Sequence, residues 1–308
     1  MRNRFFNLAN INMNSYQWNS LLDNEIENVI SLEANFFDLA DLTYLHKNNS
    51  KKMQLLKENY KRTIRFAYSL ASSLKKEISN PLKLSVLKMF HNELFNGLDK
   101  YYPGEFRDKI FKKNLLVIES PENPKKWMNF FEEYITYSLE KYNVIQAITR
   151  IYIFFLSIKP FVDGNIIIGS IYMNFLLLIL GYSNMIIKST KLKEINKVIH
   201  SFKVASTGIE ELFKNEAELS FEDKIELIEK GNFSFLEEII YLSIKESTDY
   251  LIMTSTENKN FFSVNSIAKK LNITEAGVKK RIKTGKLIAS KMNTNEWHIF
   301  PYNVFNTV

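Results

Sequence analysis

Residues 159–165 read Lys-Pro-Phe-Val-Asp-Gly-Asn, and this short polar segment separates two long apolar stretches. The preceding stretch, 143–158, and the following one, 165–181, both carry apolar side chains at intervals of three and four residues, which is typical of buried helices. Proline and glycine inside such a pattern mark a break between helices. The sequence therefore predicts two core helices joined by a tight polar loop.

The loop and the residues after it read KPFVDGNIIIGS in one-letter form, and they resemble the signature loop of the Fic family, HPFxDGNGRxxR. The resemblance implies a mainly α domain that transfers a nucleoside monophosphate, usually AMP from ATP, to a protein hydroxyl. Its catalytic positions correspond to Lys159 and Asp163, and Asp163 would bind Mg²⁺. Its phosphate-binding loop, which uses backbone N–H groups and the next helix N-terminus, corresponds to Phe161, Gly164 and Asn165.

Four departures from the signature fall on residues that act on the nucleotide. Lys159 stands where the family has a histidine base, and lysine is normally charged near pH 7. Ile166 replaces a glycine of the phosphate cradle, and its branched side chain narrows the approach. Ile167 and Ser170 replace two arginines that pair with phosphates, contacts worth about 1.5–3 kcal/mol each. The resemblance therefore predicts a catalytically dead or strongly impaired site.

Flanking segments extend the resemblance over roughly residues 20–250. Residues 90–95, which read FHNELF, and 104–107, which read GEFR, resemble the segment leading into the family's flap. Lys109–Ile118 resembles the flap hairpin, which holds a target peptide by strand addition, so a protein target is an expected partner. Residues 227–249 resemble the closing helices of larger members.

The N-terminal region, residues 1–48, includes a segment that resembles the inhibitory helix of one Fic subgroup. The resemblance rests on the sequence LEAN around Glu33. In that subgroup the glutamate pairs with the second signature arginine and blocks productive ATP binding. Because Ser170 stands at that arginine's position, we expect Glu33 to have no partner. The alternative is that Glu33 is an ordinary helix carboxylate.

Composition is typical of a globular chain with one large core and a small second domain. The 308 residues are 45% hydrophobic and 24% charged, and the absence of cysteine excludes disulfides and thiolate metal sites. The N-terminus lacks the continuous apolar segment of a secretory signal, so we expect a cytoplasmic protein. The apolar segment 166–182 is interpreted as a central core helix, not a membrane span. The four histidines lack metal-cluster spacing and are expected at the surface or in packing.

Helical spacing covers nearly all of the chain before residue 260. The predicted helices are 21–46, 51–78, 81–99, 125–141, 143–158, 165–181, 190–204, 207–215, 221–230 and 233–253. The predicted domains are the N-terminal region 1–48, a Fic-like core at 49–253, a polar linker at 254–260 and a C-terminal unit at 261–308.

The C-terminal unit has the sequence pattern of a winged helix. A helix ending at Leu271, a turn at Asn272 and a helix from Thr274 to Lys283 have the spacing of a helix-turn-helix. Residues 284–301 then read as a hairpin, the wing. The whole stretch resembles the excisionase and MerR-like winged helix domains.

Positive charge concentrates in this unit. From Lys259 to the end, nine Lys or Arg stand against two Asp or Glu, an excess that equals the formal net charge of +7 for the whole chain. Such a concentration is typical of a phosphate-binding face, so double-stranded DNA is an expected partner. The residues expected to bind DNA are Lys279, Lys280, Arg281, Lys283, Lys286 and Lys291. The alternative is that the unit forms a homodimer or presents a target protein to the flap.

These patterns predict a mainly α fold: a Fic-like helical domain with a small β-hairpin flap, plus a C-terminal winged helix-turn-helix domain. The leading function is a degenerate Fic protein, inactive or weak in AMP transfer, that acts as a DNA-associated or protein-binding regulator. Two alternatives stay open: a nucleotidyl- or phospho-group transferase that uses Lys159 and Asp163, and a scaffold that binds a peptide without a nucleotide. Mg²⁺ and ATP are expected cofactors only if the site is functional.

Overall fold

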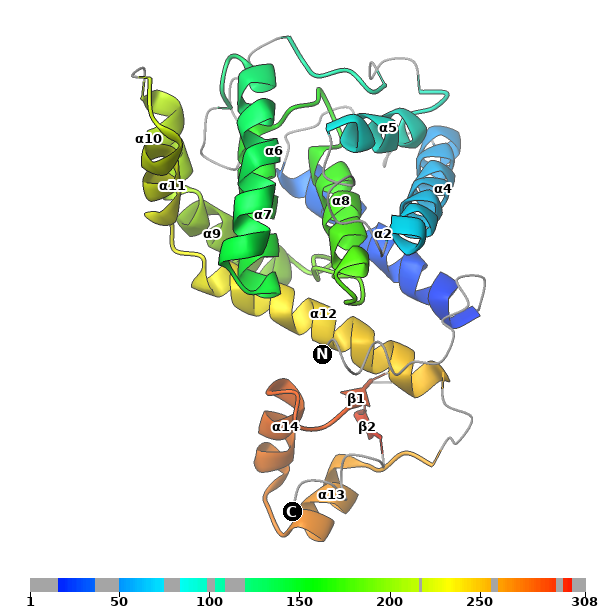
Figure 1. Ribbon diagram of the computed structural model, residues 1–308. Coiled ribbons are helices and arrows are strands. Elements are labelled where there is room, and N and C mark those ends of the chain that lie inside the picture. Colours follow the sequence, from blue (N-terminus) through cyan, green and yellow to red (C-terminus); the bar gives the residue numbers. More distant parts are fainter. Residues whose placement is uncertain are drawn as a thin grey trace.

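The computed structural model describes residues 16–36, 50–74, 84–98, 103–108, 120–215, 218–255, 260–291 and 296–300. Over this part of the chain the protein is mainly α, as predicted, with a two-stranded sheet near the C-terminus (Figure 1). The elements are α2 (Tyr16–Phe36), α4 (Ser50–Leu74), α5 (Leu84–Leu94), α6 (Pro124–Lys141), α7 (Val144–Ile158), α8 (Asn165–Ile179), α9 (Leu192–Ala205), α10 (Thr207–Lys214), α11 (Phe221–Glu229), α12 (Ser234–Ser255), α13 (Val264–Leu271), α14 (Glu275–Lys283), β1 (Ala289–Ser290) and β2 (His298–Ile299). The predicted flap, Lys109–Ile118, lies outside the described residues, as do 1–15 and 37–48 of the predicted N-terminal region.

Helix α8 lies at the centre of the helical part of the molecule (Figure 1). Helices α2, α4, α5 and α7 all pack against it, and every residue from Asn165 to Leu178 is buried. The helix is apolar all round because none of its sides faces solvent. The prediction of a core helix is confirmed. Among the described residues, moreover, no helix combines the length and the hydropathy that a membrane span requires.

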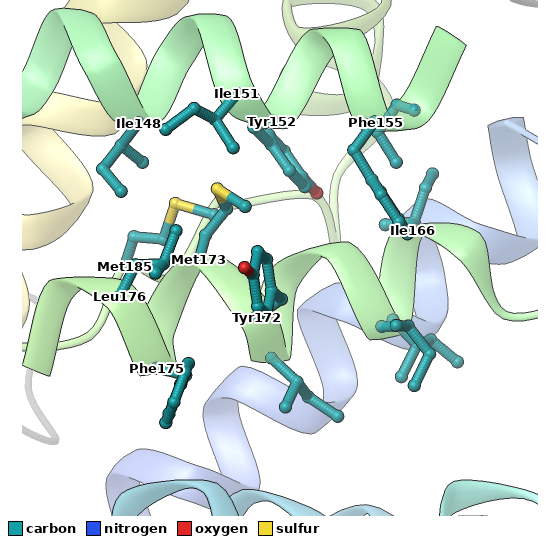
Figure 2. Packing of buried hydrophobic residues seen from close by; sticks show 14 of the residues in the cluster. Ile148, Ile151, Tyr152, Phe155, Ile166, Tyr172, Met173, Phe175, Leu176 and Met185 are labelled. Atoms are coloured by element: carbon teal, nitrogen blue, oxygen red, sulfur yellow. The ribbon is translucent and has the colours of Figure 1, made fainter. Parts of the chain in front are cut away.

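The contact between α7 and α8 is close. Figure 2 shows Tyr152 and Phe155 of α7 pointing toward α8, and Tyr172 and Met173 of α8 pointing back. A Cβ at Gly169 of α8 would lie 3.0 Å from the rings of both Tyr152 and Phe155. Because glycine leaves that space to the aromatic rings, the two helices form a rigid pair that carries the loop at one end.

Arg150 ties α7 to the later helices. Its guanidinium donates to the two carboxylate oxygens of Glu229 at 2.8 and 2.9 Å and to Glu237 at 2.8 Å. The guanidinium also lies over the rings of Tyr142 and Phe233, 4.2 and 4.3 Å from their centroids. The two carboxylates belong to α11 and α12, so α7 is anchored on the side opposite α8.

Helix α12 crosses the base of the helical part and carries the C-terminal unit (Figure 1). On its buried side Lys245 Nζ pairs with Asp249 Oδ2 at 2.7 Å, and the same oxygen accepts the N–H of Ala289 at 3.3 Å. At the surface, Lys283 Nζ pairs with Glu238 Oε1 at 2.7 Å. The C-terminal unit therefore docks on α12 through directional polar contacts.

The C-terminal unit has a buried apolar cluster separate from the main core. Its two helices meet at Asn272, which takes the left-handed conformation with φ of 50°, in agreement with the predicted turn. The strands pair antiparallel with Ala289 opposite Ile299, and Phe262 forms a further bridge to Ile299. The unit is thus two short helices joined by a tight turn and followed by a hairpin.

Three predicted boundaries need correction. The helix predicted for 21–46 begins earlier, at Tyr16. The helix predicted for 81–99 ends at Leu94, because Gly97 turns the backbone with φ of 77°. Helix α12 continues to Ser255, two residues into the predicted linker. There the hydroxyl of Thr254 donates back to a carbonyl of the preceding turn, so this polar residue is satisfied without leaving the helix.

Candidate functional site

The segment 159–165 forms the predicted loop between α7 and α8. Lys159 ends α7 with φ of 48° and ψ of 66°, and its N–H donates to the carbonyl of Phe155 at 3.1 Å. Gly164 begins α8 with φ of 71°, and a Cβ at this position would lie 2.6 Å from the ring of Phe95. The backbone conformation and the space both require glycine there.

Asn165 holds the loop closed around Phe161. The Oδ1 of Asn165 accepts the N–H of Phe161 at 3.0 Å, and its Nδ2 donates to the carbonyl of Phe161 at 2.9 Å. The ring of Phe161 stacks on His91, with centroids 4.0 Å apart and planes 13° apart. Asn165 and Phe161 therefore fix the conformation of the loop from inside it.

His91 of α5 contacts the loop, a role that the sequence analysis missed. Its Nδ1 accepts the N–H of Gly104 at 2.9 Å, and its Nε2 lies 3.3 Å from the carbonyl oxygen of Asp163. Burial lowers the pKa of His91 to about 4, so the imidazole is neutral near pH 7. With Nδ1 as acceptor, Nε2 carries the proton and donates to Asp163. The one signal in the sequence was the segment FHNELF, in which His91 directly follows an apolar residue within a predicted helix.

Arg107 fastens the start of the loop. Its backbone N–H donates to the carbonyl of Pro160 at 2.8 Å, and its Nε donates to the carbonyl of Lys159 at 2.6 Å. One terminal nitrogen donates to the carbonyls of Ile158 at 3.1 Å and Pro121 at 2.8 Å. Burial lowers the pKa of Arg107 to about 10, which leaves it charged near pH 7. A single residue thus holds three consecutive carbonyls and supports the left-handed backbone of Lys159.

The side chain of Lys159, at the position of the family's base, is only 2% exposed. Burial, and to a smaller extent the charge of Arg107, lower the pKa of Lys159 to about 8. This is the direction that a lysine base requires. Near pH 7, however, most molecules keep the proton on Lys159, because the pKa still lies above that pH.

Glu33 reaches from α2 to the N-terminus of α8. Its Oε2 accepts the N–H of Ile167 at 2.9 Å, and the side chain is fully buried. Burial raises the pKa of Glu33 to about 8, against the amides of Ile167, Ile166 and Gly164, which lower it, and the charge of Asp163 adds to the rise. The expectation that Glu33 has no partner was wrong, because free backbone amides of the helix take the place of the missing arginine.

The residues at the signature's cradle glycine and at its two arginines are buried in the core. Ile166, at the cradle glycine, and Ile167, at the first arginine, have no exposed surface. Ser170, at the second arginine, is buried, and its Oγ lies 3.0 Å from the hydroxyl of Tyr152 on α7. These positions therefore offer apolar contacts and a neutral hydroxyl where a phosphate would need cations.

Mg²⁺ and a nucleotide do not fit this arrangement as it stands. Asp163 has a hard oxygen donor suited to Mg²⁺, but its carboxylate lies close enough to Glu33 to raise the pKa of that acid. Among the described residues no group of three or more His, Cys, Asp or Glu is placed to hold a metal ion. Phosphate oxygens would have to accept hydrogen bonds from the backbone N–H groups at the N-terminus of α8. The N–H of Ile167 already donates to Glu33.

The residues expected to bind DNA lie in a part of the molecule that α12 separates from the loop (Figure 1). They belong to α14, to the turn after it and to the residue that follows β1. Lys283 pairs with Glu238 of α12 and so faces the helical part. Exposed to solvent are Lys279, Lys280, Lys283, Lys286 and Lys291, whereas Arg281 is half-buried.

The architecture is shared with solved structures, among them two Fic proteins. A Fic domain containing signaling protein from Bacteroides thetaiotaomicron has a TM-score of 0.54 at 14% identity, covering 81% of this chain and 94% of that one. A fragment of Fic-1 from C. elegans has a TM-score of 0.50 at 12% identity, covering 83% of this chain and 69% of that one. At such identities the likeness defines the fold, which is that of the Fic proteins.

Residues 81–177 match the Fic/DOC family. That segment includes α5, the loop and nearly all of α8. A search of curated proteins finds no match.

The Gly164→Ala substitution should lower the free energy of unfolding by about 2–4 kcal/mol, because it adds left-handed strain to a clash with Phe95. Urea denaturation measures the loss. Gly277→Ala on α14, where a Cβ has ordinary contacts, should be neutral or slightly stabilising. Equal stability of the two variants would contradict the geometry of the loop.

Ionisation of Glu33 should make folding less favourable as pH rises. Its folded pKa of about 8 exceeds the ordinary value, so its contribution is fully present below pH 4.5 and is lost as pH rises through 8. The loss is on the order of 4 kcal/mol. Glu33→Gln keeps an acceptor for Ile167 but cannot ionise, so its stability relative to wild type should increase between pH 5 and 8.5 in urea titrations. Glu27→Gln changes an exposed position on the same helix and should follow the wild-type dependence of stability on pH. If Glu33→Gln also followed the wild-type dependence, the raised pKa would not belong to Glu33.

Proposed function

We propose that this Fic/DOC protein transfers AMP weakly or not at all and acts as a DNA-associated or protein-binding regulator. The first half of the proposal rests on the hydrogen bond from the Ile167 N–H to Glu33 at 2.9 Å. That amide belongs to the helix N-terminus that a nucleotide's phosphates would need. Glu33 therefore acts as a plug of the anion cradle.

The residues around the plug support the same conclusion. To bind, ATP would have to displace a side chain that α2 holds in the core, and it would gain no arginine contact in return. The missing contacts at Ile167 and Ser170 are worth about 1.5–3 kcal/mol each, or roughly one to two orders of magnitude in affinity per contact. Both effects act in the same direction, against nucleotide binding.

A second candidate is a transferase with Lys159 as its base. The observation in its favour is the lowered pKa of Lys159, about 8, in a buried position. Roughly a tenth of the molecules would carry a neutral amine at pH 7. That fraction is enough for slow general-base chemistry, provided that a substrate reaches the site.

Wild-type and Glu33→Gly proteins incubated with labelled ATP and Mg²⁺ should transfer no AMP to themselves or to lysate proteins. Glu33→Gly frees the amide of Ile167 but restores no arginine. The first candidate would be refuted by robust transfer that is lost in Asp163→Ala. The same transfer should persist in Asp108→Ala, a control at an exposed site. Transfer that increases as pH rises through 8 and disappears in Lys159→Met would establish the second.

The DNA-associated part of the proposal rests on charge and on the two short helices of the C-terminal unit. The whole formal excess of +7 falls on residues 259–308. Thr274 caps α14 by accepting the N–H of Gly277 at 3.1 Å, and Val278 and Ile282 face the buried cluster. The opposite face of α14 presents lysines to solvent, where a duplex can approach.

The full chain should bind duplex DNA with an affinity that falls steeply as salt increases. If about four to six phosphates are neutralised, log K should fall against log salt with a slope of roughly −4 to −5. Lys280→Glu should weaken binding to all sequences, because a phosphate contact carries no base information. Lys203→Glu on α9 makes the same change in net charge at an exposed site and should have little effect. A flat salt response in a fluorescence anisotropy titration, or no binding at low salt, would favour a dimerisation or target-presenting role.

A further inference from the structure

Helix α2 is held by buried polar side chains as well as by apolar packing. Glu25 has no exposed surface, yet it accepts hydrogen bonds from Tyr60 at 2.7 Å, Asn174 at 2.9 Å and Asn184 at 2.6 Å. Tyr68 is the fourth polar group that faces it, and burial raises the pKa of Glu25 to about 7. All these neighbours, which come from α4, α8 and the segment after α8, are neutral, so dipoles and not a cation satisfy the acid.

A second set of bonds lies one turn further along α2. The Oδ1 of Asn28 accepts the N–H of Ser189 at 2.7 Å, and the hydroxyl of Ser189 donates to the carbonyl of Asn28 at 2.6 Å. The hydroxyl of Ser31 donates to the carbonyl of Ser189 at 2.6 Å. Glu25, Asn28 and Ser31 are three residues apart and so share one face of the helix. That face meets the extended segment 184–189.

A buried polar cluster of this kind fixes the position of the helix more than it stabilises the fold. Apolar side chains of the same shape would often stabilise a buried contact equally well. Hydrogen bonds, however, demand direction: a slip of one residue turns a helix by about 100° and would break them all. Glu33 lies eight residues after Glu25, about 12 Å along the axis. Its place at the amide of Ile167 therefore depends on the register of α2.

We propose that Glu25, Asn28 and Ser31 form a lock on the register of α2 that seats Glu33 at the amide of Ile167. Glu25 is then a positioning residue that acts through Glu33. The inference rests on the proposed role of Glu33 as a plug, and it adds what keeps the plug in place.

The test compares two variants of α2 under conditions where both are fully folded. Glu25→Gln changes the volume little but replaces one of the two acceptor oxygens with an NH₂, which faces either Asn184 or the pair Tyr60 and Asn174 and so breaks part of the lock. NMR should then show the amide of Ile167 exchanging about tenfold faster or more, and the pKa of Glu33 falling from about 8 toward its ordinary value as it reaches water. Leu22→Ala leaves a cavity under the same helix without touching the lock. It should lose stability but keep both readouts.

Unchanged exchange and pKa in Glu25→Gln, or equal changes in both variants, would overturn the lock. If Glu25→Gln does not fold, Asn28→Ala gives the same readouts, because it removes the acceptor of the Ser189 amide, and the other side-chain bonds of Asn28 go to Asn24 within the same helix. Neither readout uses activity. Robust AMP transfer by the wild-type protein would therefore refute the proposed function while the NMR result still decides whether the lock exists.

Discussion

The free amides at the N-terminus of α8 are the constraint on which the rest of this structure depends. Because α8 is buried along almost its whole length, N–H groups at its start have to be satisfied inside the protein. In an active Fic loop the nucleotide phosphates would meet that demand, whereas here Glu33 meets it from within the chain. Without an arginine beside it, the buried acid loses its charge near pH 7. Under the proposed function, Glu33 thus acts as a nearly neutral plug.

The shape of the loop is fixed by residues other than those expected to act on a nucleotide. Arg107, His91 and Asn165 all bond main-chain atoms of the loop, and none of these bonds involves a side chain that departs from the Fic signature. Substitution of the catalytic histidine, the cradle glycine and the arginines therefore leaves the frame intact. A fold of this kind can lose catalytic groups one at a time while its backbone stays the same.

Periodicity was sufficient to predict most helices, because α7 and α8 have strongly apolar faces and a proline and a glycine between them. It was less informative at helix ends, where the left-handed turn at Gly97 stops α5. The bond between Glu33 and Ile167 was not predictable, because nearly every residue has a backbone N–H and the sequence does not show which one will donate to a carboxylate. The prediction for Glu33 considered only side chains as partners. The same reason hid the roles of Arg107 and His91, whose bonds go to main-chain atoms of the loop.

The buried pair of Lys245 and Asp249, with its bond to Ala289, has a consequence for how the chain unfolds. A unit of about 50 residues with a small apolar cluster gains little stability by itself. Docking on α12 supplies support, and α12 also packs against α2, α7 and α9. Loss of α12 would remove support from the C-terminal unit, helix α2 and the core together. The two ends of the molecule are thus joined into one cooperative unit, in which a destabilising change at either end lowers the stability of the other.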